Sequence, residues 1–555
     1  MEKERVAAQP SAGKLFNFRP VLFAAVFMTL GVGFAFFHVF GGLSAKWLLC
    51  LLPLAAFPVF LSLPMHRWKR AAIALAMLCI SFFIGLIGFI VQVNRYEDVT
   101  AFSGCYFAGT IVEMREGKGT TALVLDELTV DGKAQKCKLI AYMPASVCEN
   151  LRLADQVSLY GDIENRTYER ESFSMQAKDF GKEIYLTATV SECAKIGRTY
   201  RLSLLLNARA KEVIEHGMDE TVAAVTKAVL LGDTAGIDAG LYENIRRGGI
   251  AHIFAISGLH VGALFGFCLS LLKKTVLRRL PALLKFSFVT FVLITYAGVC
   301  AFSPSVVRAT VICLSAYLGK LFQAKTDFLQ ALGLSAVCIL LFTPSALFTV
   351  GFQLSFAACF GIAFLTKPIG QVFDEVAKLF RKRFPRKLTA IEEEAIKNDD
   401  TLPPRISTRI YRAVTSFLAT SLGAQIFTAP LLLYYFGYLS GWALLLNCLF
   451  VPFIGVVFSF LLLSVCIACI VPTAFSTVIL YIPNLIWSTV LLLFETADFT
   501  KFAIEGLSVS VGVMIPYLFA ILFFTDKWNV KKSFRFVLCG VCILAFGVGM
   551  VALNL

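Results

Sequence analysis

The chain has 555 residues, of which 58% are hydrophobic and 16% charged, and its formal net charge is +14. A mean hydropathy of +0.75 excludes an ordinary soluble enzyme and predicts an α-helical polytopic membrane protein. Apolar runs near the roughly 20 residues that cross a bilayer predict about thirteen spans. The predicted spans cover residues 21–40, 47–64, 71–93, 253–272, 283–302, 306–322, 327–343, 347–366, 413–436, 442–470, 474–494, 508–525 and 534–553.

Lysine and arginine cluster in alternate loops between these runs. The basic segments are the amino terminus, 66–70, 273–285, 320–325, 367–412 and 527–535. Cytoplasmic loops carry this bias, so we expect a multi-pass protein of the cytoplasmic membrane with its amino terminus inside. The same scheme predicts an external segment at 94–200, a cytoplasmic loop at 367–412 and an external carboxy terminus. Most of the net charge then reflects orientation in the lipid bilayer rather than attraction to nucleic acid.

The segment 94–200 has the pattern of β-structure. Apolar and polar residues alternate over 122–130, and the Asp131-Gly132 turn leads into a second run at 136–142, which predicts a hairpin. Further runs at 106–113, 156–163 and 183–190 raise the number of strands to about five, which predicts a small OB-like barrel, although other small barrels have as many.

An OB-like barrel can bind a nucleic-acid strand by stacking bases on aromatic rings beside a positive groove. Acidic side chains slightly outnumber basic ones in this segment, so such a face would have to be local. The candidate DNA-contacting residues are Arg166, Tyr168, Arg170 and Lys178. The alternative interpretation is an ordinary solvated rim.

Four of the sixteen cysteines lie in the predicted β domain, at Cys105, Cys137, Cys148 and Cys193. An even number of cysteines in an external domain predicts disulfides, and four cysteines allow three pairings. We expect at least one bond, with Cys105–Cys193 tying the two ends of the domain and Cys137–Cys148 closing a short loop. The spacing lacks the close Cys-x-x-Cys pairs of zinc sites, so we expect no metal and no cofactor.

Residues 201–249 connect the β domain to the second membrane block. The runs 201–217 and 222–231 have helical apolar spacing with intermittent charge, which predicts interfacial helices on the outer leaflet. Asp238 is the predicted N-cap of a short helix that ends at Gly248. The expected domains are 1–93 (membrane helices), 94–200 (external OB-like domain), 201–249 (interfacial helices) and 250–555 (membrane channel).

The run Ile250 to Leu264, IAHIFAISGLHVGAL, is apolar but contains His252, His260 and the pair Ser257-Gly258. Burying an imidazole or hydroxyl in hydrocarbon is costly unless the group faces protein or a water-filled cavity. This run therefore predicts a broken helix that lines something polar.

Several motifs resemble those of the ComEC family of competence DNA channels. They are LLGDTAGI at 230–237, RGGIAH at 247–252, AISGLHV at 255–261, SPSVVRA at 303–309, GFQLSF at 351–356 and QIFTAPLLLYYFG at 425–437, with Asn447 and Pro452 beyond. They occur in the family's order, and the likeness extends over nearly the whole chain.

The resemblance implies that one strand of incoming DNA crosses the cytoplasmic membrane during natural transformation while the other is degraded outside. It also implies partners: single-stranded DNA, a DNA receptor outside, a separate nuclease, and a cytoplasmic ATPase or single-strand-binding protein. Longer members carry a carboxy-terminal metallo-β-lactamase-like domain, whereas this chain ends at Leu555 and its histidines form no His-x-His-x-Asp-His cluster. We therefore expect no enzymatic activity in this polypeptide.

A channel for a polyanion needs polar or cationic groups along a wet lumen. The expected path residues are Asp233, His252, Ser257, Gly258, His260, Arg308, Gln353, Gln425 and Asn447. Arg308 would attract phosphate at the outer mouth, or else it snorkels to the interface or pairs with an acid. The neutral side chains would solvate the strand, or else they form hydrogen bonds between helices.

Other functions remain open at this point. Asp233, Ser257 and His260 are the residue types of a catalytic triad, but no nucleophile-elbow pattern surrounds the serine. A metal site at His252 and His260 lacks an acidic third ligand. The same broken helix would also suit a secondary transporter or exporter of a small polar solute. A membrane scaffold with a binding barrel would need no polar lumen.

Overall fold

The computed structural model describes residues 19–41, 68–116, 119–148, 150–254, 256–383, 406–496, 499, 503–506, 509–524, 538–546 and 548–549. The chain divides into two compact units. The larger unit contains Arg19–Gln353 and Val451–Lys501, and the smaller unit contains Met1–Phe18, Leu354–Phe450 and Phe502–Leu555. The break between them falls inside two long helices, α14 (Val350–Arg383) and α17 (Ala443–Ile470).

Seven helices among the described residues are long and apolar enough to cross a membrane, which indicates a multi-pass membrane protein. They are Pro20–Gly41, Leu75–Glu97, Ala282–Val299, Val350–Ala377, Tyr411–Phe436, Ala443–Ile470 and Thr473–Thr496. The runs expected at 253–272, 306–322 and 327–343 form α10 (Gly258–Lys274), α12 (Pro304–Leu321) and α13 (Phe328–Phe342), which are shorter or more polar. The run at 47–64 lies outside the described residues.

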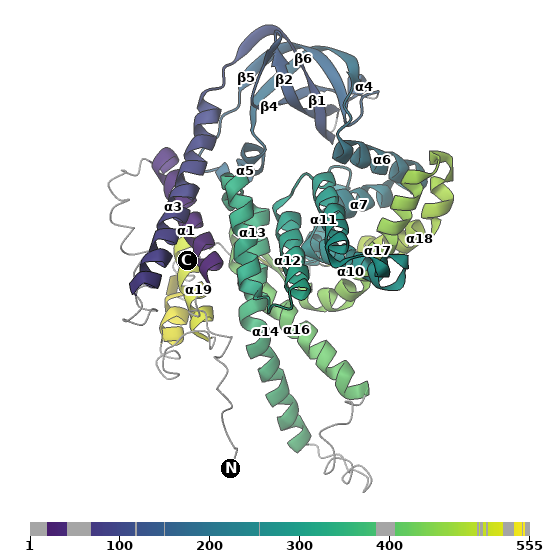
Figure 1. The fold of residues 1–555 in the computed structure, drawn as a ribbon. Helices are drawn as coiled ribbons and strands as arrows, with labels where there is room; N and C mark the ends of the chain where they lie inside the picture. Colours follow the sequence, from purple (N-terminus) through teal and green to yellow (C-terminus); the bar gives the residue numbers. More distant parts are fainter. Residues whose placement is uncertain are drawn as a thin grey trace. The chain divides into compact units, whose positions relative to one another are not determined.

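A six-stranded mixed sheet forms the β domain of the larger unit (Figure 1). Its strands are β1 (Phe102–Glu116), β2 (Thr120–Val130), β3 (Lys133–Ala134), β4 (Lys138–Pro144), β5 (Asp155–Asn165) and β6 (Ile184–Arg198). The order is β1-β5-β6-β4-β2-β3, and β1 also pairs with β2, so the pairings return to the first strand. All pairs are antiparallel except β4 with β6.

The five longer strands include the runs that the alternating pattern predicted. The expected hairpin is present, since β2 and β4 pair antiparallel and Leu123 lies opposite Ala141. The two-residue strand β3 follows the Asp131-Gly132 turn and pairs only with β2. Alternate residues of β5 are buried, as a sheet with one face on a core requires.

All four cysteines of the β domain are free thiols in the structure, so the expected disulfides are not formed. Cys105 of β1 pairs with Gly161 of β5, whereas Cys193 of β6 pairs with Leu159 on the other edge of β5. Neighbouring strands are about 4.8 Å apart, which separates two residues on either side of one strand by about 10 Å. That separation exceeds the roughly 7 Å between Cα atoms that a disulfide can bridge.

The second expected bond is excluded by the length of β4. Cys137 precedes this strand, and Cys148 ends the helical turn α4 (Ala145–Cys148) that follows it. A strand of 7 residues spans about 23 Å at 3.3 Å per residue, which places the two thiols near opposite ends of β4. Both bonds look plausible in the sequence because sequence spacing contains no information about register.

The β domain packs against the first membrane helices of the larger unit. Gln92 of α3 (Trp68–Glu97) donates from Nε2 to the Ser345 hydroxyl and to the carbonyl of Phe180, both at 3.2 Å. Ser345 lies in the 3-10 turn η2 (Pro344–Phe348), and Phe180 in α5 (Phe173–Gly181). These bonds tie three segments that are far apart in the sequence.

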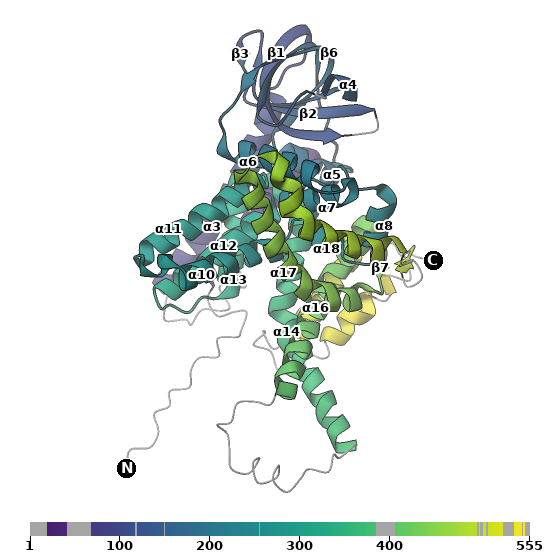
Figure 2. The ribbon, with the colours of Figure 1, turned by 90° about the vertical axis from the view of Figure 1, so that its right-hand side faces the viewer.

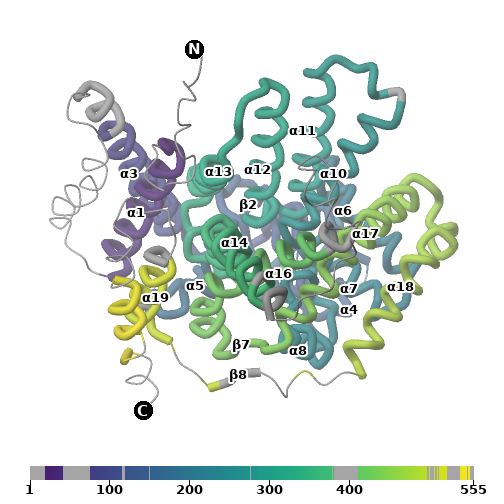
Figure 3. The backbone as a smooth tube through the Cα atoms, turned by 90° about the horizontal axis from the view of Figure 1, so that it is seen from below, coloured from purple at the N-terminus to yellow at the C-terminus, as the bar shows by residue number. Residues whose placement is uncertain are grey.

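Two glycines allow α1 (Pro20–Gly41) and α3 to touch through their backbones. A Cβ on Gly31 would lie 2.0 Å from the carbonyl oxygen of Phe82, and one on Gly85 would lie 2.2 Å from that of Met28. Figure 3 shows these two helices side by side. Close approach through small residues is a common way for apolar helices to associate, because it increases van der Waals contact.

The connecting helices are α6 (Leu202–Gly217), α7 (Glu220–Leu231) and α8 (Ala239–Arg247). The predicted N-cap is confirmed, since the carboxylate of Asp238 accepts from the backbone N–H groups of Gly240 (2.8 Å) and Leu241 (3.0 Å). However, α7 is buried on nearly every side, so it is a packed helix rather than one lying on a surface. Helix propensity and apolar spacing predicted that these helices form, but not which other helices they pack against.

Arg209 on α6 joins that helix to the turn between α17 and α18 (Ser476–Thr496). Its guanidinium donates to the carbonyl oxygens of Cys469 (3.3 Å) and Val471 (2.7 Å) and to the hydroxyl of Thr473 (2.6 Å). The carbonyl groups at a helix carboxy terminus lack intrahelical donors, and a cation there also suits the helix dipole. Arg209 is therefore a structural residue.

In the smaller unit, α14 packs against α16 (Ile406–Phe436), as Figure 3 shows. A Cβ on Gly361 would lie 2.2 Å from the carbonyl oxygen of Gly423, so these helices also need small residues. The loop expected at 367–412 is shorter, because α14 continues through Arg383 and α16 begins at Ile406. The unit also contains the pair β7 (Tyr438–Ser440) with β8 (Ala503–Glu505) and the helix α19 (Val511–Phe524).

Candidate functional site

The polar run that begins at Ile250 is a broken helix, as predicted. α9 (Ala251–Phe254) ends before α10 begins at Gly258, and Ser257 has the extended backbone angles φ −128° and ψ 168°. The first N–H groups of a helix have no partner within the helix, and they give its amino terminus a partial positive charge. The break therefore creates a positive helix end inside an otherwise apolar stretch.

His260 lies one turn into α10, and its side chain is fully buried. Its Nδ1 accepts a hydrogen bond from the Ser257 backbone N–H at 3.2 Å, and its ring stacks on Phe458 of α17 with 4.4 Å between centroids. An accepting Nδ1 places the proton of a neutral imidazole on Nε2. Nε2 has no hydrogen-bond partner among the residues that the structure describes, so a buried donor is available there.

Arg308 reaches the same place from α12. The helix starts at Pro304, directly after the Ser303 cap position, and Arg308 is only 7% exposed. Its Nη2 atom lies 3.0 Å from the position that a Cβ on Gly258 would occupy. Glycine at the start of α10 therefore gives the guanidinium room to approach the helix end.

The electrostatics of this arrangement favour an anion. A guanidinium and a helix amino terminus are both positive, so together they raise the local electrostatic potential. Backbone N–H groups and arginine are also the groups that proteins use most often to hold phosphate. The site built by Gly258, His260 and Arg308 is called the break site below.

Other segments hold the break site in place. Gly232 ends α7 with φ +78°, a conformation that glycine adopts without strain, and a Cβ there would lie 3.0 Å from Ile256. The Tyr296 hydroxyl of α11 (Ala282–Val299) donates to the carbonyl oxygen of Leu230 at 3.1 Å. Figure 2 shows α10, α11 and α12 beside one another. The structure thus brings together three of the sequence motifs, at 230–237, 255–261 and 303–309.

The remaining path residues of the larger unit have local roles. Asp233 forms an ion pair with Lys211 and accepts the Ala235 N–H at 3.3 Å. Gln353 donates to the carbonyl oxygen of Leu347 at 3.1 Å, which links α14 to η2. His252 lies on α9 and is exposed. Asp233 and Gln353 are not bonded to His260, whereas His252 lies close enough to His260 to interact with it electrostatically.

Two path residues belong to the smaller unit. Gln425 on α16 donates to the Ser421 hydroxyl one turn earlier, at 3.2 Å. Asn447 on α17 is 7% exposed, and its Oδ1 has no hydrogen-bond partner within the described part of the chain. Gln425 therefore has a bond within its own helix, whereas Asn447 has a buried acceptor that is free to bind another group.

Three of the four residues of the proposed DNA-contacting face make contacts within the larger unit. Tyr168 is 5% exposed, and its hydroxyl donates to the carbonyl oxygen of Ile184. Arg166 pairs with Asp179 at 3.0 Å, and Arg170 lies over the ring of Phe37 at 5.5 Å. A base cannot stack on a ring that is already inside the core. Tyr168 is therefore unavailable for stacking, whereas Arg170 and Lys178 are exposed.

Lys178, the last residue of that face, lies beside a network of charges. Burial and the neighbouring cation Lys182 lower the pKa of Lys178. Within the network, Arg115 binds Glu113 at 2.9 Å and Asp179 at 2.7 Å. Although burial alone would raise it, the ion pairs with Lys182 and Arg115 lower the pKa of Glu113 to about 2. These charges satisfy one another.

No group of three or more His, Cys, Asp or Glu side chains suited to a metal ion occurs in the described ranges. Sequence reasoning missed two important residues. Phe458 is one of 52 phenylalanines, and nothing in its local sequence distinguishes it. Arg209 looks like one more charge on an amphipathic helix.

A family model described as "Competence protein" matches residues 229–530. The chain is 27% identical over 231 residues to ComE operon protein 3 of Bacillus subtilis, a match that covers 41% of this chain and 24% of that protein. It is 32% identical over 128 residues to an uncharacterized protein, MG316, of Mycoplasma genitalium, covering 23% of this chain and 32% of that protein. The matches thus span about a quarter to a third of these relatives. No solved structure matches the chain.

Proposed function

The chain belongs to the competence protein family, and from this premise we propose that it conducts a single strand of DNA across the cytoplasmic membrane during natural transformation. The observation that carries the proposal is the break site, where a buried guanidinium and a buried imidazole donor meet the positive end of α10. A strand with one negative charge per nucleotide needs such groups to pass through hydrocarbon.

The break site would bind each phosphodiester only briefly. Arg308 supplies the one full positive charge, while the α10 terminus and Nε2 of His260 supply partial charge and a hydrogen bond. Conduction requires binding that is favourable enough for entry and weak enough for release. A neutral histidine beside a single arginine suits that balance better than a cluster of cations. At another point of the path, Asn447 would solvate the strand by accepting a hydrogen bond at Oδ1.

We also propose the finer topology that the basic loops predict, with about thirteen spans, the amino terminus inside and the β domain outside. In the same proposal the β domain is an OB-like barrel, because its strand pairings return to β1. A receptor outside would deliver DNA, a separate nuclease would degrade the other strand, and a cytoplasmic ATPase or single-strand-binding protein would draw the strand inward.

A transformation assay in a competent host that lacks its own channel tests the function. We expect Arg308→Ala to reduce the number of transformants at least about tenfold, which corresponds to the loss of one charge-assisted bond, while an immunoblot of membranes shows an unchanged amount of protein. His260→Asn should act in the same direction, because asparagine can still accept the Ser257 N–H but has no donor in place of Nε2. Arg209→Ala is the matched control. It removes the bonds to the α17–α18 turn and should lower the amount of protein.

Two results would contradict the proposal in different ways. Full DNA uptake by both Arg308→Ala and His260→Asn would remove the break site from the path. Normal transformation of a host from which this chain alone is deleted would remove the channel function itself. Uptake of a small solute, but not of DNA, by vesicles that contain the pure protein would favour a transporter instead.

A further inference from the structure

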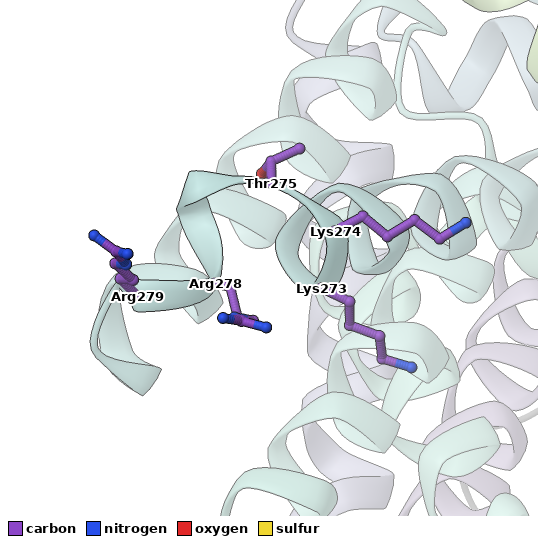
Figure 4. A pocket seen from close by; sticks show the side chains of 5 residues that line it. All are labelled: Lys273, Lys274, Thr275, Arg278 and Arg279. Carbon is purple, nitrogen blue, oxygen red and sulfur yellow. The ribbon is translucent and has the colours of Figure 1, made fainter.

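A dense group of positive charges lies where α10 ends. Lys273 and Lys274 are in its last turn, and Arg278 and Arg279 follow on the short helix η1 (Val276–Arg279). The four side chains and Thr275, shown in Figure 4, line an open hollow of about 320 Å³. All four cations are exposed, and none forms an ion pair with an acid of the described ranges. This group is called the basic turn.

The basic turn is held in a fixed shape despite its repulsion. The Thr275 hydroxyl accepts the Leu277 N–H at 3.3 Å and donates to the carbonyl oxygen of Leu271 at 2.6 Å. A fifth cation, Lys285, donates from Nζ to the carbonyl oxygen of Arg278 at 2.8 Å. Several like charges held within one turn attract an anion strongly, and phosphate oxygens accept bonds from lysine and arginine alike.

An apolar crevice of about 180 Å³ begins close to the basic turn. It lies between α10, α11 and α17, and its walls include Leu264, Phe267 and Leu271 of α10, Phe288 of α11 and Leu462 of α17. All of these residues belong to the larger unit. Ser459 is the one lining residue that has a hydroxyl group, and this hydroxyl already donates to the carbonyl oxygen of Gly455.

The crevice and the basic turn follow one face of α10. Leu264, Phe267 and Leu271 are three or four residues apart, and Lys274 continues the same series. Residues at this spacing lie on one side of a helix, and three residues correspond to a rise of about 4.5 Å. The apolar floor therefore leads directly to the cations, so a single amphiphile can reach both.

We propose that this site binds an anionic phospholipid, with its phosphate in the basic turn and part of an acyl chain in the crevice. The positive charge of the basic turn favours an anionic headgroup. The apolar crevice favours a lipid over a nucleic acid, because an acyl chain can fill it and a phosphodiester strand cannot. The start of α11 supports the choice, since Leu283 (69% exposed) and Leu284 (53% exposed) follow the cations directly. Apolar side chains beside a cluster of basic residues are typical of contact with an anionic membrane surface.

Retention of lipid by the pure full-length protein tests the proposal. The protein in neutral detergent is mixed with phosphatidylglycerol or phosphatidylcholine, and bound lipid is counted by native mass spectrometry. We expect phosphatidylglycerol to be retained in preference to phosphatidylcholine. Excess glycerol phosphate, which is the headgroup without chains, should displace little of it. Lys274→Gln with Arg278→Gln should weaken retention about 25-fold, since each basic residue near an anionic lipid contributes roughly a factor of five.

Two further variants distinguish binding at this site from nonspecific attraction of the lipid to positive charge. Lys320→Gln with Lys325→Gln removes the same charge from another exposed helix end and should leave retention unchanged. Ser459→Phe should fill the crevice without changing the charge, and it should weaken retention severalfold. Equal losses in the two double variants would overturn the proposal, as would unchanged retention in Ser459→Phe. Displacement of the lipid by a single-stranded oligonucleotide at equal phosphate concentration would also overturn it, in favour of a DNA contact.

Discussion

The β domain and the break site both bury polar and charged side chains, but they differ in how those groups are satisfied. In the β domain, Asp179 binds Arg115 and Arg166, so each charge has an opposite charge beside it. In the break site, Nε2 of His260 is buried and has no bonding partner among the described residues. Charges paired within a domain support its fold, whereas a buried donor without a partner can still bind another group. Mutations should therefore cost stability in the first region and activity in the second.

The largest effect is expected in the β domain. Asp179→Ala leaves the partly buried Arg166 without its carboxylate and Arg115 with Glu113 alone, which should cost about 3 kcal/mol of folding stability. The β domain of the full chain in membranes should then become sensitive to trypsin under conditions in which the unmutated protein resists it. Glu192→Ala, which removes an exposed acid from the same domain, is the control and should change nothing. Equal sensitivity of both variants would mean that the network does not stabilise the domain.

A smaller effect, on activity alone, is expected in the break site. Gly258→Ala puts a methyl group 3.0 Å from Nη2 of Arg308, so the guanidinium must shift by a few tenths of an ångström. We expect transformation to fall about fivefold, which corresponds to about 1 kcal/mol, with an unchanged amount of protein. Gly262→Ala is the matched control, since a Cβ there meets nothing within 4 Å. If the two variants transform equally well, close contact at Gly258 is not needed.

The smallest effect concerns acid stability. The ordinary pKa of 4.5 for Glu113 is lowered to about 2 in the folded protein by Lys182 and Arg115, which outweigh the opposite effect of burial. A lowered pKa contributes stability above the ordinary value, and that contribution is lost as the pH falls from about 4.5 to about 2. Pepsin digestion of the membrane-bound chain, normalised to an unfolded substrate, should therefore accelerate over this interval. Glu113→Gln should flatten the change, and an identical pH profile for this variant would refute the assignment.

Local features of the fold could be predicted from the sequence, because they depend on neighbouring residues. The N-cap at Asp238 and the break before Gly258 follow from short-range hydrogen bonding and backbone freedom. The alternating pattern predicted the five longer strands for the same reason. Whole-chain composition predicted a membrane protein, since burial in lipid demands it.

Features that depend on register or on distant partners were predicted poorly. The pairing of Cys105 with Cys193 failed because β5 lies between them, and no sequence pattern records that. Tyr168 looked like a ligand platform, but the core of the β domain uses its ring. His260 and Arg308 were chosen as path residues from their polarity alone, whereas Phe458 became visible only through its stacking on His260.

The last strand of the β domain has a consequence for biosynthesis. β6 pairs with β5 on one edge and with β4 on the other, so neither β4 nor β5 has its full complement of backbone bonds until β6 is made. Roughly 40 residues separate the end of β4 from the start of β6, which corresponds to about 2 to 8 s of translation at 5–20 residues per second. The edge of β4 throughout that interval, and the edge of β5 once it has been made, can pair with the wrong strand or with a neighbouring nascent chain. The order of the strands therefore leaves backbone groups of β4 and β5 unpaired until the last strand is in place.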